Sequence, residues 1–152
     1  MLALITAAHA QQPATANADI HLSPPLRGLL QEEMREVARG TQPLAIALAS
    51  GDWNTLADTS AKIRASYILE KKLSAAQKRE LEHALPAGFK QLDAEFHARA
   101  EKLAHAAGAR DPELAAFHFS RMVESCIACH SAYAKARFPG FSSTKPAADH
   151  RH

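Results

Sequence analysis

The sequence lacks three features that would each point to a class of protein. It has no apolar run of 18 residues, so no segment is long enough to span a bilayer as a helix. Its net charge is only +2, which gives no reason to expect nucleic acid or an anionic membrane as a partner. It also has no sustained alternation of polar and apolar residues, so we predict no strand.

What the chain does contain favours helices. Its 152 residues are 47% hydrophobic but only 6% aromatic, a composition typical of one domain of close-packed helices. Apolar residues recur at helical spacing in four long segments, at about 25–49, 53–71, 89–108 and 112–135. A capping box at Ser74 starts a short helix that ends near Leu85. We expect Pro43 to kink or break the first helix after Gln42. Four long helices with short links predict an all-α, antiparallel four-helix bundle.

The two ends of the chain differ from this pattern. Residues 1–10 combine a short apolar run with Ala8-His9-Ala10, which fits the cleavage site of a signal peptide; an apolar tail is the alternative. Residues 11–22 are polar and rich in alanine and proline, as in a linker. Residues 142–152 are expected to form a flexible tail, which leaves 23–141 as the bundle domain. A signal peptide predicts export.

Five residues near the C-terminal end carry the strongest chemical signal: Cys126-Ile127-Ala128-Cys129-His130. On a helix, positions i, i+3 and i+4 lie on one face, so both thiols and the imidazole can reach one flat ligand. A Cys-x-x-Cys-His run is the attachment pattern of a c-type haem, in which the thiols bind two vinyl groups and the histidine binds iron. We therefore predict one covalent haem c, attached through Cys126 and Cys129 and ligated by His130.

Three other interpretations of the two cysteines are weaker. A thioredoxin-like pair belongs in a βαβ setting, and no predicted strand surrounds this one. A zinc site needs four ligands, usually two cysteine pairs or two cysteines and two histidines, and the chain has only two cysteines. A plain disulfide leaves the histidine that directly follows the second cysteine unexplained.

The residue on the other face of the haem has to come from another helix. Met122 lies eight residues before His130 on the same helix, and Met1 belongs to the predicted signal peptide. Met34 is therefore the one remaining thioether, on the apolar stripe of the first helix between Leu30 and Val37. The alternative is that Met34 only packs in the core, as methionines at helical spacing commonly do.

These residues and their order resemble the class II c-type cytochromes, the cytochrome c′ and cytochrome c-556 group, over about residues 22–133. In that family a four-helix bundle carries the haem motif in its last helix and the distal residue in its first. The resemblance implies either that Met34 is a sixth ligand, as in the c-556 branch, or that the iron is five-coordinate, as in the c′ branch. Tyr133 matches the aromatic residue that commonly follows the haem histidine. Ala134 stands where a basic residue is usual, and Lys135 and Arg137 are the nearest substitutes.

We therefore expect a periplasmic monohaem electron carrier that is not an enzyme, with His130 and Met34 on the iron and a redox protein as partner. The alternatives are a five-coordinate protein that binds nitric oxide or carbon monoxide, and an electron-transfer subunit of a larger redox complex. A peroxidase is disfavoured, because Glu33 and Arg35 are expected to point away from the apolar stripe of the first helix. Family members are often dimers through their first two helices, although no residue here requires a homodimer.

The remaining charged residues and histidines give weaker signals. Lys135, Arg137 and Lys145 place positive charge after the haem motif, which suits either a solvated helix end or a docking patch for an acidic partner. His97 and His105 lie beside the apolar stripe of their helix, and we expect both to be solvated. His150 and His152 have no third fixed ligand, so we expect no metal site in the tail.

Overall fold

The computed structural model describes residues 20–141, without the side chains of Glu70 and Lys71. The predicted signal peptide, most of the linker, Lys145 and the C-terminal tail lie outside this range. The described residues form helices and no strand: α1 (Pro24–Ser50), α2 (Trp53–Arg64), α3 (Leu69–Lys72), α4 (Ala75–Ala84), α5 (Ala87–Gly108), α6 (Pro112–Tyr133) and the 3₁₀ turn η1 (Pro139–Phe141). The prediction of an all-α fold is confirmed. None of these helices is both long and apolar enough to cross a membrane.

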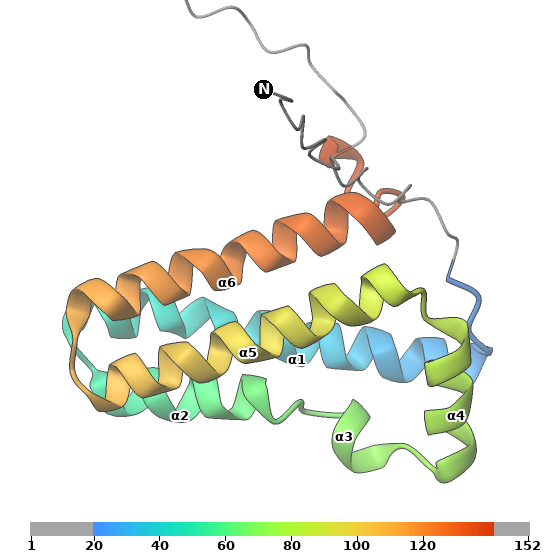
Figure 1. The fold of residues 1–152 in the computed structure, drawn as a ribbon, viewed down its shortest axis with the longest axis horizontal. Helices are drawn as coiled ribbons and strands as arrows, with labels where there is room; N and C mark the ends of the chain where they lie inside the picture. Colours follow the sequence, from blue (N-terminus) through green and yellow to red (C-terminus); the bar gives the residue numbers. More distant parts are fainter. Residues whose placement is uncertain (1–19, 142–152) are drawn as a thin grey trace, which may run out of the picture.

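The long helices lie side by side, and their ends divide the molecule into two halves (Figure 1). The α1–α2 turn and the α5–α6 turn lie at one end, on the left of the view, and we call this the closed half. The start of α1, the end of α6 and the short helix α4 lie toward the other end. Helix α5 packs against both α2 and α6, whereas α1 packs mainly against α2 and touches α6 much less.

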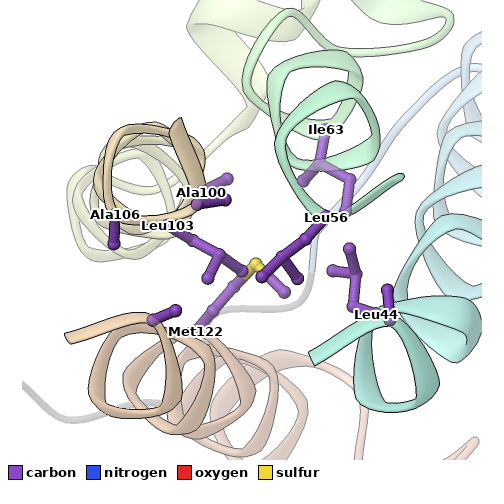
Figure 2. Close-up of a cluster of buried hydrophobic side chains, with 10 residues drawn as sticks. Leu44, Leu56, Ile63, Ala100, Leu103, Ala106 and Met122 are labelled. Atoms are coloured by element: carbon purple, nitrogen blue, oxygen red, sulfur yellow. The ribbon is translucent and has the colours of Figure 1, made fainter. Parts of the chain in front are cut away.

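The apolar core fills the closed half. Leu44 from α1, Leu56 and Ile63 from α2, and Leu103 from α5 are fully buried. Met122 from α6 is also fully buried, and its sulfur points into the middle of this cluster (Figure 2). Small side chains complete the core and let the helices approach closely: Ala47, Ala100, Ala106, Ala107 and Ala115.

Local capping explains the two tight turns of the closed half. Gly51 ends α1 in the left-handed region, with φ 69°, where glycine avoids the steric cost of a Cβ. Asp52 then caps α2, because its carboxylate accepts a hydrogen bond from the backbone N–H of Thr55. At the other turn Asp111 accepts from the N–H of Leu114 and starts α6. Here the left-handed residue is Arg110, with φ 54°, and not Gly108, which ends α5.

The break that we expected Pro43 to cause in α1 does not occur, and a kink there stays a prediction. The helix is continuous from Pro24 to Ser50, with Pro43 inside it. Proline lacks the N–H that would bind the carbonyl of Arg39 four residues earlier. Both residues are exposed, so water can satisfy that carbonyl and the helix does not have to end.

The second helix is shorter than predicted. We expected it to reach residue 71, but α2 ends at Arg64 and the chain turns before α3 begins at Leu69. Ser66 adopts the left-handed region in this turn, with φ 54°. The segment 65–68, which we call the α2–α3 corner, is held by a side chain from α1 that is described below.

Helix α4 is fixed to the start of α1. The capping box predicted at Ser74 is confirmed: Ser74 Oγ accepts from the N–H of Gln77, and Gln77 Oε1 accepts from the N–H of Ser74. Ser23 does not cap α1 with its side chain. Its N–H and hydroxyl instead donate to the carboxylate of Glu80 on α4, at 2.8 and 3.0 Å. Leu22, which we had assigned to the linker, is buried beside this contact.

Candidate functional site

The Cys-x-x-Cys-His motif lies in the last two turns of α6, in the half of the molecule away from the apolar core. Cys126, Cys129 and His130 are all half-buried, and the cysteines are unpaired thiols. Arg99 on α5 fixes this part of α6: its guanidinium donates to Ser125 Oγ at 2.8 Å and to the carbonyl of Arg121. The motif is therefore presented by a helix that is tied to its neighbour one residue before the first cysteine.

Both thiols have pKa values above the usual value for cysteine, which disfavours nucleophilic redox chemistry. Burial raises the pKa of Cys126. Burial, with the negative charge of Asp93 and the neighbouring Cys126, raises the pKa of Cys129 to about 11. Thioredoxin-like cysteines need lowered pKa values, because the thiolate is the reactive form. Within residues 20–141 no group of three or more histidine, cysteine, aspartate or glutamate side chains that could hold a metal ion comes together.

The imidazole of His130 packs against the residues that follow α6. Its ring stacks on Phe138, with centroids 4.3 Å apart and planes at 18°. The guanidinium of Arg137 lies over the Phe138 ring, 5.9 Å from its centroid. Burial, and then the charge of Arg137, lower the pKa of His130, which favours the neutral form of the ring. Neutral imidazole is the form that binds a metal ion.

Tyr133, the aromatic residue singled out after the motif, connects α6 to the start of α5. Its ring makes an edge contact with Phe89, at a centroid distance of 5.4 Å. A Cβ on Gly88 would lie 2.7 Å from the Tyr133 hydroxyl oxygen, so glycine allows this close approach. The motif is thus supported on both sides by α5, through Arg99 before it and through Phe89 after it.

A cavity of about 700 Å³ borders the same part of α5, where Lys90, Asp93, Phe96 and His97 line it. Its volume is in the range of roughly 300–1,000 Å³ that is usual for cofactor and ligand sites. Its wall is made by α1, residues 64–73, α4 and α5. Its larger aliphatic side chains are Val37, Leu69, Leu73, Leu81 and Leu85, and Phe96 adds an aromatic ring. Charged side chains also line it: Glu33, Arg64, Lys78, Glu82, Lys90 and Asp93. Asp93 borders this cavity and also acts electrostatically on Cys129. The cavity and the motif therefore flank the same segment of α5.

Met34 lies on the wall of this cavity. It is 41% exposed, so the expectation that it faces inward with Leu30 and Val37 is only partly correct. Met122 is fully buried in the closed half, as expected for a core residue. The three motif residues are not among those that line the cavity. The structure thus places Met34 beside a cavity but does not bring it together with His130, and its role as a ligand stays a prediction.

Two polar residues of the cavity were misjudged from the sequence. Glu33, expected to point away from the apolar stripe, is only 2% exposed. It lies seven residues after Leu26, which places both side chains within about 20° of each other around the helix axis, whereas Met34 is about 80° from Leu26. The spacing from Leu26 therefore indicates, from the sequence alone, that the side chain of Glu33 lies on the buried face of α1. His97, expected to be solvated, is half-buried, and its Nδ1–H donates to the carbonyl of Ile63 at 2.9 Å.

The residues present fit a covalently attached haem. Two unpaired thiols and a neutral imidazole lie on one stretch of one helix, which is the donor set that this attachment needs. A cavity with several aliphatic side chains borders the same segment of α5, although the motif residues themselves do not line it. The fold and this donor set together define a helical-bundle c-type cytochrome.

Comparison with known proteins agrees with this class. The model of the family described as cytochrome c′ matches residues 28–134, a region that contains Met34 and the whole Cys-x-x-Cys-His motif. The chain belongs to this family, a class II c-type cytochrome family. Membership indicates a haem-binding protein; members are generally haem carriers or binders and not enzymes, and they are typically exported. Neither the curated proteins nor the solved structures gave a match.

Proposed function

We propose that the chain is an exported, periplasmic monohaem c-type cytochrome that carries electrons. In this proposal the long helices form an antiparallel bundle around one haem, and Cys126 and Cys129 form thioethers with it. His130 binds the iron from α6, and Met34 binds it from α1. Bound haem supplies one-electron chemistry at the iron, and a methionine–histidine ligand pair raises its reduction potential.

The position of Met34 carries this proposal. Of the two methionines in the part of the chain that the structure describes, Met122 is fully buried in the closed half, and Met34 lines the cavity that borders α5, the helix against which the motif-bearing end of α6 packs. Partial exposure of Met34 leaves its thioether unconfined by core packing, so a small rotation of the side chain can bring the sulfur to a ligand in the cavity. A fully packed methionine such as Met122 has no such freedom.

The optical spectrum of the purified holoprotein tests the ligand set. We expect a low-spin ferric spectrum with the weak far-red band of sulfur-to-iron charge transfer, and slow uptake of carbon monoxide by the ferrous form. Met34→Leu keeps the volume of the side chain but removes the sulfur, so the far-red band should disappear and carbon monoxide should bind quickly. Met122→Leu makes the same chemical change in the core and should leave the spectrum unchanged.

The same spectra can contradict the proposed ligand set. If Met34→Leu keeps the spectrum of the wild-type protein, Met34 is not the sixth ligand. A wild-type ferric spectrum that is already high-spin, with fast carbon monoxide binding, would instead favour the five-coordinate gas-binding protein. The observation in favour of that second candidate is the cavity, whose aliphatic side chains could form a distal pocket for a diatomic gas.

We also propose that the electron leaves through a partner protein that docks at the end of α6. Arg137 is exposed there and Lys135 is half-buried, close to the residues that hold His130. Positive charge at this point would attract an acidic redox protein, whether a soluble carrier or the rest of a larger complex. The rate of electron transfer to such a partner should fall as the salt concentration rises, and more so for the wild-type protein than for Arg137→Gln. Equal salt dependence would contradict docking at this end.

A further inference from the structure

Glu33 is a buried carboxylate that the proposed function does not use. It lies on α1, one residue before Met34, and is 2% exposed. Its oxygens accept hydrogen bonds from three successive backbone N–H groups: Tyr67 at 2.9 Å, Ile68, and Leu69 at 3.1 Å. A buried charge is costly unless it is compensated, and three convergent N–H groups provide that compensation. The interaction is therefore specific and strongly directional.

These N–H groups belong to the α2–α3 corner and the first residue of α3. The corner is a break in the helical path, with Ser66 in the left-handed region, so these backbone groups have no helical partner of their own. Glu33 takes the place of that partner. Ala65 and Ser66 of the same corner, and Leu69 at the start of α3, belong to the cavity wall on which Met34 lies.

The contact also fixes the rotation of α1. Adjacent side chains on a helix are about 100° apart around its axis, so anchoring Glu33 to the corner sets the direction in which Met34 projects. We propose that Glu33 is a positioning residue. Its hydrogen bonds to the α2–α3 corner hold the Met34 thioether on the cavity wall. This inference rests on the proposed function, in which that thioether binds the haem iron.

A matched control is present on the same helix. Glu32, the preceding residue, also reaches α3, through a 3.3 Å pair between its carboxylate and Lys72. Both side chains of that pair are largely exposed, at 39% and 57%, and solvent screens the interaction. Glu32 and Glu33 therefore connect the same two elements, but only Glu33 does so by buried hydrogen bonds to the corner.

The test compares Glu33→Gln with Glu32→Gln in the holoprotein. Glutamine keeps the size of the side chain but puts an amide NH₂ where one carboxylate oxygen accepts, so two donors would face each other. Hydrogen exchange at the N–H groups of residues 67–69 should rise by about tenfold or more in Glu33→Gln, because these groups lose their acceptor. The same variant should show a high-spin ferric component and faster carbon monoxide binding. Glu32→Gln should show none of these changes.

Each outcome decides between the two proposals. If exchange at 67–69 rises but the spectrum and carbon monoxide binding stay as in the wild-type protein, Glu33 only stabilises the corner and the positioning role is wrong. If Met34→Leu itself leaves the spectrum unchanged, the ligand assignment fails and the positioning role fails with it. If Glu33→Gln does not fold, Glu33→Asp carries the same test, since it keeps the charge but shortens the reach; it should give intermediate exchange, with a spectrum shifted in the same direction.

Discussion

The charge of the Glu33 carboxylate links one residue to the stability of the whole chain. Burial raises its pKa, but the hydrogen bonds from the N–H groups of Tyr67, Ile68 and Leu69 lower it more, so the folded pKa lies below the ordinary value. A lowered folded pKa means that the carboxylate stabilises the fold at any pH above its unfolded pKa. This contribution disappears as the pH falls through the folded pKa.

Glu33→Gln should therefore be less stable than the wild-type protein by roughly 1–3 kcal/mol at neutral pH, because buried N–H groups lose an ionised acceptor. The difference should shrink in acid, once the wild-type carboxylate is itself protonated. Urea unfolding of both proteins, at neutral pH and at several values below the ordinary glutamate pKa, measures it. A difference that is constant over this range would show that the charge of Glu33 does not contribute.

For single residues, the placement of the motif on one helical face was predictable from the sequence, whereas the surroundings of Met34 were not. The spacing of Cys126, Cys129 and His130 already places them on one helical face, whatever the rest of the chain does. The direction of Met34 depends on which side of α1 is buried. Hydrophobicity assigned that side to the aliphatic residues and left out Glu33, whose partners lie more than 30 residues away and appear only in the fold.

Helix α1 carries a proline that costs it stability. Pro43 lies in a continuous helix, so the carbonyl of Arg39 has no N–H to accept from. Pro43→Ala should restore that hydrogen bond and stabilise the protein by about 1–3 kcal/mol, measured by the urea midpoint. Pro24 is the matched control, since it is the first residue of α1, where the N–H has no helical partner anyway. An equal gain from Pro24→Ala and Pro43→Ala would contradict this explanation.

The start of α6 depends on one carboxylate. Asp111 accepts a 2.9 Å hydrogen bond from the N–H of Leu114, and Pro112 follows it as the first helical residue. Asp111→Ala should cost about 1 kcal/mol in the free energy of unfolding, as is usual for the loss of an N-cap. Asp58→Ala is the control: Asp58 is exposed on α2, and the change should stay within about 0.5 kcal/mol. If the two variants unfold alike, the cap contributes nothing to stability.

Whether an element begins where the sequence predicts it depends on whether the signal is local. The starts of α2, α4 and α6 were predictable, because each is set by a capping side chain within three residues. The end of α2 was not. Apolar spacing continues past Arg64, but the helix ends there, and the backbone N–H groups that follow are bound by Glu33 from another helix. No local pattern carries that information.

For the whole molecule, helical periodicity sufficed to predict a bundle, but not how its core is distributed. Most of the fully buried side chains, Met122 included, gather in the closed half between the two tight turns, although Leu26 near the start of α1 is fully buried as well. The other half holds the motif and the cavity. The helix that carries Met34 packs far less against the helix that carries His130 than against α2.

We therefore expect removal of the haem to loosen one half of the protein more than the other. A Cys126→Ser/Cys129→Ser variant, which cannot form the thioethers, should lose stability to urea on the order of 2–4 kcal/mol. Hydrogen exchange resolves where this loss occurs. The backbone of α1 before Val37 and of α6 after Ser125 should exchange faster, whereas the segments around Leu44 and Leu103 should keep most of their protection, because their packing does not involve the cavity. Uniform loss of protection along α1 and α6 would show that the two halves fold as one unit and would contradict this division.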